Sequence, residues 1–542
     1  MKKTLPIGND SFRRIREDDS YYADKTLLIQ DFIRSNDIVS LVTRPRRFGK
    51  TLNITMLREF FDITMDGCDI FKGLAIMDTE YASQINSRPV IYITFKDCKA
   101  ATAESLLFLI SDVVLKEYQK YYTILKEAPE TNDSRYVTFF MTYNKLLRRD
   151  IDINLLQISI ETLERVLYAF YKTKVIVLID EYDQPIMSGI EYGYHDILQP
   201  FFTCLYGTAL KGSDCLHQAM LTGIQRVVKE SIFSQLNNVR VYTAVDKKYS
   251  AYFGFTEDET SKLLSYYDLS LNEPVKLKYN GYIFGDREMY NPWSIINYAD
   301  TGQLNNYWIN TSTNYLVKKS ISESGDFFRN DFDKLIAEGV AIVSADLSCS
   351  FQELEHASTL WGLLINAGYM TVIELVDELF YKVRIPNGEV RSEFIKIIAD
   401  IAMVQSRDLF IMFHSLMKKD IEGFLKVYRE LVISCTSYHD AKENAYHMLF
   451  LGMCITLNNL YKITSNIESG YGRYDIRMES LSPEKPHIII EFKQGEAIDV
   501  LKEEALQQIL TNRYYDGLQG EVLCLGIAHD KKRCGVAYKL LS

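Results

Sequence analysis

With 542 residues, the chain is too long for one hydrophobic core, and its length predicts about three or four domains. Hydrophobic residues make up 47% and charged residues 25%, a globular composition that excludes a largely disordered chain. The net charge of −11 excludes a generally basic nucleic-acid-binding surface, so any contact with phosphates must come from a few placed cations.

The cysteine pattern and the absence of long apolar runs predict a cytoplasmic protein. The nine cysteines form no CxxC pair and no Cys/His cluster at zinc spacing, which indicates a reducing compartment. The N-terminal MKKTLPIGND has no apolar run behind its lysines, so we expect no signal peptide. No apolar run approaches the ~18–20 residues of a membrane span, so we expect no membrane partner.

From Ile38 to about Arg240, short apolar runs alternate with helical stretches. The runs are Ile38–Val42, Val90–Phe95, Val175–Ile179 and Gln218–Thr222. Short buried runs separated by helices are typical of parallel strands in βαβ units. This part of the chain therefore predicts an α/β sandwich.

The segment Thr43–Thr51 has the arrangement of a phosphate-binding loop, because it lies between a predicted strand and a predicted helix, Thr51–Phe61. Gly49 lets the backbone approach phosphates, Lys50 would reach the β- and γ-phosphates, and the Thr51 hydroxyl would hold Mg²⁺. The usual first glycine is replaced by Arg44, so an ordinary helix start stays an alternative.

A second motif supports the nucleotide site. Lys174–Glu181 is an apolar run that ends in two carboxylates, as a Walker B strand does. Asp180 would bind Mg²⁺, and Glu181 would polarise the attacking water as catalytic base. The alternative is a strand that ends in an acidic turn. Two motifs in the right order favour a nucleotide site.

A third strand, Ala219–Gly223, is followed by Gln225 and Arg226. Polar groups at this position would sense the γ-phosphate, and Arg226 would act as an arginine finger. The alternative for Arg226 is a surface salt bridge.

The middle of the chain is mostly helical from Thr256 to about Thr311, which predicts a lid. Phe327 to about Phe394 predicts a small helical module with a β-wing at Phe380–Ile385. After about Ala399, helices precede strands at Tyr461–Asn466, Tyr474–Glu479, His487–Lys493 and Glu521–Ala528, with a helix at Leu501–Tyr514 before the last strand. This order predicts a second, smaller α/β domain.

The C-terminal strands carry a candidate metal site. Glu491 and Lys493 share one face of a strand, and Asp475 begins the preceding strand. Asp475 and Glu491 would hold a divalent cation, Glu443 is a further ligand candidate, and Lys493 would activate water or stabilise charge on a phosphate. Cross-strand ion pairs are the alternative. Gln508 and Tyr514 would face the site, unless their helix is simply amphipathic.

The N-terminal half resembles the AAA-ATPase-like proteins whose P-loop reads Arg-Pro-Arg-Arg-Phe-Gly-Lys-Ser/Thr, here Arg44–Thr51. In that family arginine replaces the first glycine as a rule. Other matching pieces are Tyr22–Thr26, Asp180–Asp183, Phe233–Asn238 and Tyr290–Ser294. The resemblance implies nucleotide contact at Lys50 and Thr51 and Mg²⁺ at Asp180. We also count Arg44, Arg46, Arg47 and Gly49 as nucleotide-binding candidates.

The C-terminal part resembles the PD-(D/E)XK nuclease domain commonly fused to that family. The matching stretches are Ser465–Asp475, Glu491–Lys493, and Gln508–Ile509 with Tyr514. The resemblance implies a nuclease metal at Asp475 and Glu491. Trp361–Tyr369 with Ile385–Arg391 resembles the family's winged-helix-like connector.

These observations predict a P-loop domain at 1–250, a helical lid at 251–325, a winged-helix-like connector at 326–400 and a restriction-endonuclease-like α/β domain at 401–542. Our hypothesis is an ATP-driven switch that controls a Mg²⁺- or Mn²⁺-dependent nuclease acting on nucleic acid, with foreign or mobile DNA as the expected substrate. The rival is a signalling scaffold whose nuclease-like domain only binds nucleic acid or a partner. The 17 basic and 18 acidic residues of 401–542 favour this rival modestly.

Two further alternatives stay open. The nucleotide would be structural if hydrolysis is slow or absent. Arg46 and Arg47 would serve a neighbouring subunit's nucleotide in a homo-oligomer, but a monomer is equally compatible with the sequence.

Overall fold

The computed structural model describes residues 2–127, 133–226, 238–308, 328, 331–332, 334–335, 339–348, 356–401, 406–435, 450, 457, 460–465, 468–469, 472–530 and 533–542. The chain divides into two compact units. The first comprises Met1–Asn310, Asp346–Leu354 and Trp361–Thr371. The second comprises Thr311–Ala345, Glu355–Leu360 and Val372–Ser542.

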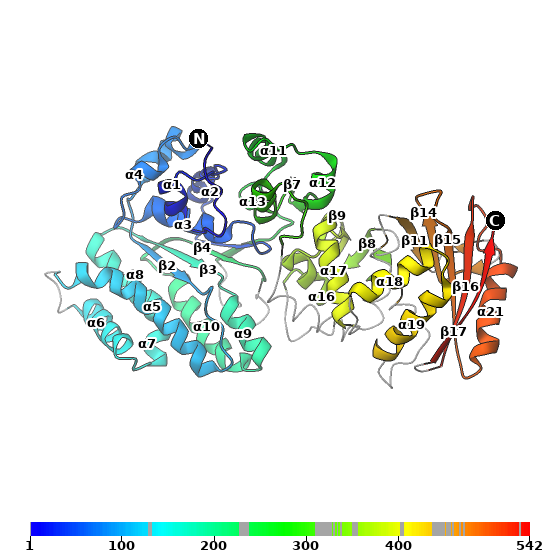
Figure 1. Ribbon diagram of the computed structural model, residues 1–542. Helices are drawn as coiled ribbons and strands as arrows, with labels where there is room; N and C mark the ends of the chain where they lie inside the picture. The colour runs from blue at the N-terminus through cyan, green and yellow to red at the C-terminus, as the bar shows by residue number, and fades with distance from the viewer. Residues whose placement is uncertain are drawn as a thin grey trace. The chain divides into compact units, whose positions relative to one another are not determined.

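A five-stranded parallel sheet forms the centre of the first unit (Figure 1). Its strands are β1 (Val39–Thr43), β2 (Val90–Thr94), β3 (Val175–Asp180), β4 (Leu216–Gly223) and β5 (Val239–Tyr242), in the spatial order β2-β3-β4-β1-β5. Strand β4 lies between β1 and β3, and Leu221 pairs with Leu41 on one side and Ile179 on the other. Four of these strands were predicted. The short edge strand β5 was not, because it is only partly buried.

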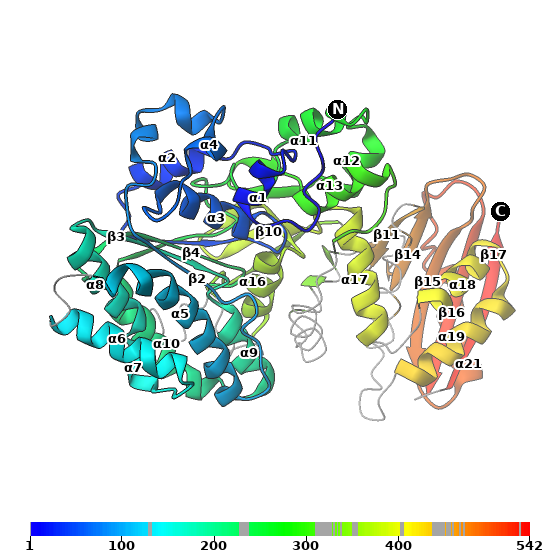
Figure 2. The same ribbon diagram turned by 60° about the vertical axis from the view of Figure 1, so that its left-hand side comes forward.

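Helices cover both faces of this sheet. Figures 1 and 2 show α1 (Phe12–Glu17), α2 (Leu27–Arg34), α3 (Lys50–Phe61) and α4 (Cys68–Phe71) on one face, and α5 (Ala103–Leu125), α8 (Ser159–Tyr171) and α10 (His195–Leu210) on the other. Other helices before β4 in the chain are α6 (Ser134–Leu147), α7 (Ile153–Gln157), α9 (Gln184–Tyr192) and the 3₁₀ helices Ala75–Asp78 and Glu80–Gln84. Strands buried between two helical layers confirm the predicted α/β sandwich.

Residues 243–308 follow the sheet as a small module that we call the lid. It contains α11 (Glu257–Tyr266), α12 (Glu273–Tyr279), α13 (Pro292–Thr301) and the hairpin of β6 (Tyr282–Phe284) and β7 (Arg287–Met289). Its core includes Leu263 and Tyr290, and Tyr21 of the N-terminal segment packs against that core. The buried Lys25 pairs with Glu259 at 2.6 Å. The lid therefore has its own core and is tied to the N-terminal segment.

The predicted wing is part of a small sheet with the order β8-β10-β9. The strands are β8 (Ala341–Ser344), β9 (Thr371–Asp377) and β10 (Phe380–Arg384), and β10 matches the wing predicted at Phe380–Ile385. The helices nearby in sequence are α16 (Ala357–Ala367), α17 (Gly388–Ile401), α18 (Ser406–Met417) and α19 (Ile421–Cys435). Both α16 and β9 cross the division between the two units.

The second unit ends in a five-stranded mixed sheet with the order β11-β14-β15-β16-β17. Its strands are β11 (Tyr461–Ser465), β14 (Ile476–Ser480), β15 (His487–Gln494), β16 (Val522–Asp530) and β17 (Arg533–Leu541), with the short pair β12 (Glu468–Ser469) and β13 (Gly472–Arg473) between β11 and β14 in the chain. Only β15 and β16 run parallel, and α21 (Ile498–Thr511) connects them. The four predicted strands and the helix are confirmed. The fifth strand, β17, was missed because its second half is largely exposed and mixed in polarity.

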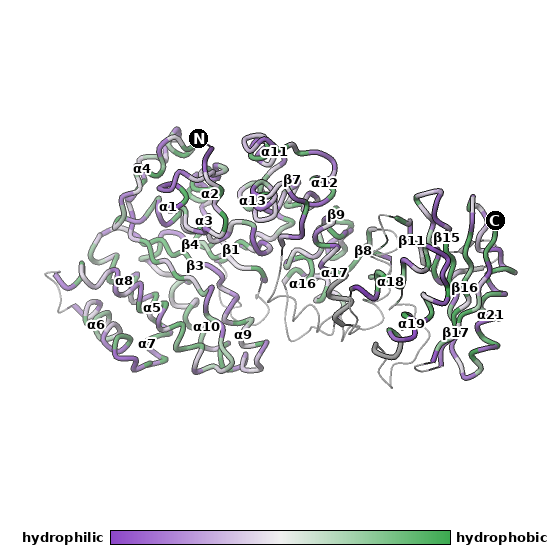
Figure 3. The backbone as a smooth tube through the Cα atoms, in the orientation of Figure 1, coloured by the Kyte–Doolittle hydropathy of each residue, from purple (hydrophilic) through white to green (hydrophobic). Residues whose placement is uncertain are grey.

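Hydrophobic residues follow the central strands of both sheets (Figure 3). Every residue of β3 is buried, and β16 is buried over all but its last residue. Among the described residues, no helix has the length and apolar character that crossing a membrane requires.

Candidate functional sites

The predicted phosphate loop connects β1 to α3 at the carboxyl edge of the parallel sheet. Thr43 ends β1, and Lys50 is the first residue of α3. Gly49 precedes the helix in the left-handed conformation, with φ 82°, which glycine adopts without a steric penalty. The free backbone N–H groups at the start of α3 therefore lie at the edge of the sheet where α/β proteins bind ligands.

The Lys50 ammonium lies inside this loop. Its Nζ donates to the carbonyl oxygens of Arg44 at 3.2 Å and Pro45 at 3.1 Å, and it lies 3.6 Å from Glu181 Oε1. The side chain is only 3% exposed. A buried cation held by two carbonyls and a nearby carboxylate is placed for exchange onto phosphate oxygens.

The Thr51 hydroxyl and Asp180 meet across the sheet edge. Thr51 Oγ1 donates to Asp180 Oδ2 at 2.8 Å, and Thr222 Oγ1 donates to Asp180 Oδ1 at 2.7 Å. Burial, and next the neighbouring Glu181 carboxylate, raise the pKa of Asp180 to about 6. The pair predicted to hold Mg²⁺ is therefore brought together. Thr222 was not among the site residues predicted from the sequence. Its position, a threonine near the end of a buried strand, was a signal that it lies at this site.

Glu181 follows β3 in a left-handed backbone conformation, with φ 52°. Such a conformation costs free energy in a residue with a side chain and is concentrated at functional sites. The carboxylate is partly exposed and lies beside the Lys50 ammonium. This position next to the loop is compatible with the predicted role as base.

The arginines of the loop contact other parts of the first unit. The Arg44 side chain is fully buried, and its Nη1 donates to the carbonyl oxygens of Thr43 at 2.8 Å and Tyr242 at 3.0 Å. The Arg47 guanidinium lies 4.0 Å from the centre of the Trp293 ring in the lid. Arg46 is half-buried, and its carbonyl accepts from Asn291. The Arg44 guanidinium therefore makes its contacts inside the protein, and nucleotide contact by Arg44, Arg46 or Arg47 stays a prediction.

Strand β4 leads into a polar turn that Asp183 organises. Asp183 Oδ2 accepts from the backbone N–H groups of Ile224 at 2.9 Å and Gln225 at 2.7 Å. Burial, followed by Glu181, raises the pKa of Asp183 to about 6. A Cβ at Gly223 would lie 2.5 Å from Asp183 Oδ1, so glycine permits this approach. Asp183 ends the Asp180–Asp183 stretch of the family resemblance, which gave no indication of this role.

Arg226 is half-buried at the end of this turn, next to residues outside the described part of the chain. Its role as an arginine finger stays a prediction. Of the matching stretch Phe233–Asn238, only Asn238 lies within the described residues.

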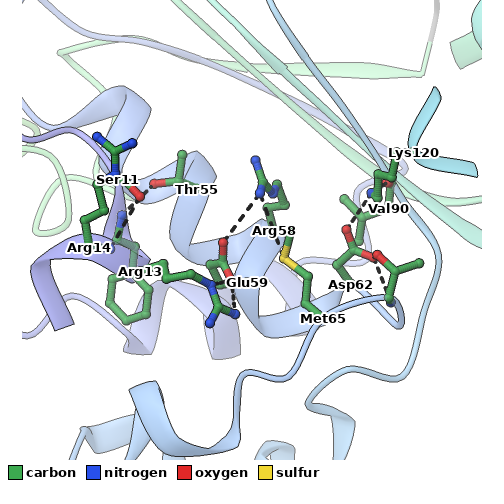
Figure 4. A network of polar contacts seen from close by, with 12 residues as sticks. Ser11, Arg13, Arg14, Thr55, Arg58, Glu59, Asp62, Met65, Val90 and Lys120 are labelled. Carbon is green, nitrogen blue, oxygen red and sulfur yellow. Dashed lines mark hydrogen bonds and ion pairs between the residues drawn. The ribbon is translucent and has the colours of Figure 1, made fainter. Parts of the chain in front are cut away.

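Ion pairs fix the helix that carries Lys50 and Thr51 (Figure 4). The buried Glu59 of α3 pairs with Arg13 of α1 at 2.7 Å and with Arg58 at 3.6 Å. At the end of α3, the buried Asp62 pairs with Lys120 of α5 at 2.6 Å. Losing one partner of a buried ion pair typically costs about 3–5 kcal/mol, so these contacts hold the loop's helix in place.

These residues fit a nucleotide with Mg²⁺. A threonine hydroxyl and a carboxylate are the hard oxygen donors that Mg²⁺ prefers, and they lie 2.8 Å apart in the described structure. Apart from Gly49 and its two chain neighbours, no atom of the described residues lies within 4 Å of the position that a Cβ at Gly49 would occupy. The space beside Gly49 is therefore open.

The second site lies where β14 begins and β15 ends. The backbone N–H of Asp475 donates to Glu491 Oε2 at 3.3 Å, and Asp475 Oδ2 accepts from the N–H of Phe492 at 2.7 Å. These reciprocal bonds place the two carboxylates on adjacent strands next to each other. The sequence predicted this pair correctly as neighbours.

Glu491 also contacts a lysine and a glutamine. Lys493 Nζ lies 3.5 Å from Glu491 Oε1, and Gln508 Nε2 of α21 donates to the same oxygen. Gln508 is 3.2 Å from the hydroxyl of Tyr514, which also accepts from Asn512 at 2.9 Å. The helix therefore does face the site through Gln508, and the buried Tyr514 supports that glutamine.

Burial and the Asp475 carboxylate raise the pKa of Glu491 to about 8. Two carboxylates that repel each other in a buried place fit a divalent cation, which would relieve the repulsion. Among the described residues, no group of three or more His, Cys, Asp or Glu side chains has metal-binding geometry. The third candidate ligand, Glu443, lies outside the described residues.

The sheet order and the loop between β1 and α3 define the first unit as a P-loop NTPase fold, and the second unit ends in a nuclease-like mixed sheet. Comparison with protein families agrees. Residues 6–233 match the AAA-ATPase-like family, which is described as a predicted AAA-ATPase. Residues 441–539 match the PD-(D/E)XK nuclease superfamily. The chain thus joins an AAA-ATPase-like domain to a C-terminal PD-(D/E)XK nuclease superfamily domain.

A relative from Azotobacter chroococcum mcd 1 is similar over much of the chain. It is described as an uncharacterized protein in vnfD 5'region. The two sequences are 28% identical over 402 residues, which cover 72% of this chain and 69% of the relative. The similarity therefore extends beyond either family match alone.

Proposed function

We propose that this protein is an ATP-driven switch that controls a metal-dependent phosphodiesterase acting on nucleic acid, with foreign or mobile DNA as the substrate to test first. The observation that carries the proposal is the presence of two separate polar sites in one chain. One is formed by Lys50, Thr51 and Asp180, and the other by Asp475 and Glu491. The two family matches support the chemical class of each site.

At the first site, ATP would place its β- and γ-phosphates at the start of α3. Lys50 would exchange its two loop carbonyls for phosphate oxygens. Mg²⁺ bound by Thr51 and Asp180 would supply positive charge that stabilises the charge developing on the phosphate. Glu181, adjacent to the Lys50 ammonium, would accept a proton from the attacking water.

At the second site, Asp475 and Glu491 would hold the divalent cation through their carboxylate oxygens. A divalent cation held there would polarise a bound water and lower its pKa, which would assist attack on the phosphodiester. The Lys493 ammonium would stabilise negative charge on the phosphodiester. Gln508, which donates to Glu491, would keep that carboxylate oriented.

The test is a nuclease assay on single- and double-stranded DNA and RNA with Mg²⁺ or Mn²⁺, with and without ATP. We expect ATP to change the cleavage rate of the wild type, and Lys50→Ala to remove that ATP response. We expect Lys493→Ala to abolish cleavage. Lys462→Ala is the matched control, because Lys462 lies on the same sheet and pairs with Glu479 at 3.9 Å, away from the two carboxylates. Equal behaviour of wild type and Lys493→Ala would refute catalysis.

A scaffold is the second candidate, in which the nuclease-like domain binds nucleic acid or a partner without cleaving it. It is favoured by the presence of only two carboxylates at the described site, one of which is already paired with Lys493 and Gln508. Calorimetry with Mn²⁺ separates the two functions. Binding that Asp475→Ala abolishes supports catalysis, and absence of any binding supports the scaffold.

A further inference from the structure

The buried Arg44 side chain lies between the P-loop and the lid. Its guanidinium carbon is 5.5 Å from the ring centre of Phe253 and 5.2 Å from that of Phe284, and both rings belong to the lid. The same guanidinium donates to the carbonyl oxygens of Thr43, at the end of β1, and Tyr242, at the end of β5. Arg44 thus connects two strand ends to two lid rings.

The burial of the Arg44 charge is only partly compensated. Among the described residues, burial lowers the pKa of Arg44 more than the nearby Asp246 raises it, and Arg44 Nε and Nη2 make no hydrogen bond. Burial lowers the pKa of Arg44 to about 10, which reflects the unfavourable transfer of its charge from water. Replacing a buried charge by an apolar side chain of similar volume is often neutral or stabilising. A buried charge without full compensation is expected where function requires it.

The rest of the loop contacts the same lid. Phe48 packs at 4.9 Å from the ring of Tyr282 and 5.0 Å from that of Phe284. The exposed Arg47 stacks on Trp293 at 4.0 Å. The carbonyl of Arg46 accepts from Asn291 at 3.5 Å. The outer side of the loop is therefore attached to the lid, and its inner side faces the phosphate position.

Lys50 links these two sides, because its ammonium holds the carbonyls of Arg44 and Pro45. We propose that Arg44, assisted by Arg47, is a positioning residue that couples ATP binding to the position of the lid. When phosphates bind the Lys50 ammonium, the carbonyls of Arg44 and Pro45 lose their hydrogen-bond donor. The loop and the attached lid then readjust together. By linkage, a docked lid in turn alters ATP affinity. This inference rests on the proposed function, because it requires ATP at the P-loop.

The experiment compares the full-length wild type with Arg44→Met and Arg44→Lys. It measures the Kd of a non-hydrolysable ATP analogue, kcat, the thermal midpoint and the change in tryptophan fluorescence on binding, which Trp293→Phe assigns to Trp293. We expect Arg44→Met to keep or raise the thermal midpoint, to weaken analogue binding about fivefold or more, and to lose the Trp293 response. Arg44→Lys should recover part of the analogue affinity and part of the Trp293 response. Arg240→Met, an exposed arginine of β5, is the matched control and should behave as wild type.

A second variant keeps the test decisive if Arg44→Met does not fold. Arg47→Gln removes an exposed side chain, and it should weaken analogue binding and reduce the Trp293 response. Wild-type affinity and a full Trp293 response in Arg44→Met, or in Arg47→Gln if Arg44→Met is unfolded, overturn the inference and leave the proposed function intact. Absence of analogue binding by the wild type overturns both.

Discussion

Metal binding at the second site should depend strongly on pH, because a cation has to replace the proton of Glu491. In the metal-free protein, burial and the Asp475 carboxylate raise the pKa of Glu491 to about 8. The ordinary value for a glutamate is about 4.3, so Glu491 is mainly neutral at pH 7 instead of ionised. Only the ionised carboxylate binds a divalent cation well.

The size of the effect follows from this pKa. About one molecule in ten has an ionised Glu491 at pH 7, and about one in a hundred at pH 6. The apparent Kd for Mn²⁺ should therefore be about fiftyfold weaker at pH 6 than at pH 8, and it should become constant well above pH 8. Each bound ion should release about one proton near pH 6.5.

Isothermal titration calorimetry in buffers of different ionisation enthalpy measures both quantities. Glu491→Gln is the control, since it cannot ionise and should bind Mn²⁺ weakly with little dependence on pH. Mn²⁺ binding that changes less than about threefold between pH 6 and pH 8, without proton release, would refute this account of Glu491.

Three substitutions in the first unit test the other assignments. Glu181→Gln should lower ATP turnover about a hundredfold or more and retain ATP binding, and equal turnover would remove Glu181 from the role of base. Thr222→Val removes a hydroxyl that donates to Asp180, the proposed Mg²⁺ ligand, and should weaken Mg²⁺-dependent ATP binding about tenfold; an unchanged Mg²⁺ titration would contradict this. Gly368→Ala should lower the free energy of unfolding by about 1–2 kcal/mol in denaturant titrations, because φ is 86° and the new Cβ would lie 2.7 Å from Pro45 Cβ. Gly302→Ala is the control, because Gly302 also has a positive φ, 66°, but none of the neighbouring atoms considered lies within 4 Å of its Cβ position. An equal loss of unfolding free energy in both variants would exclude the contact with Pro45 as a cause.

The P-loop could be predicted from the sequence because its requirements are local. A buried strand, a glycine and the Lys50–Thr51 pair at a helix start occupy one short segment, and backbone geometry alone brings them together. The apolar run that ends in Asp180 was recognisable for the same reason. Glu491 and Lys493 share a strand face through the period of two, which again is local.

Other parts of the sites depend on contacts between distant segments. Thr222 reaches Asp180 only because β4 lies between β1 and β3, and strand order is not encoded in any single segment. Gln508 reaches Glu491 only because α21 packs beside β15. Such pairings are selected by the burial of whole strands and helices, which no local pattern specifies.

Arg44 shows the difference most clearly. Its position in the motif was evident from the sequence, and it was counted among the nucleotide-binding candidates. Only the folded chain decides where the side chain points, because the lid rings of Phe253 and Phe284, more than 200 positions further along the sequence, enclose it. The sequence by itself determined which chemical groups stand at the loop. The tertiary structure decided that Lys50 lies inside the loop and that Arg44 lies against the lid, because burial against distant side chains orients each one.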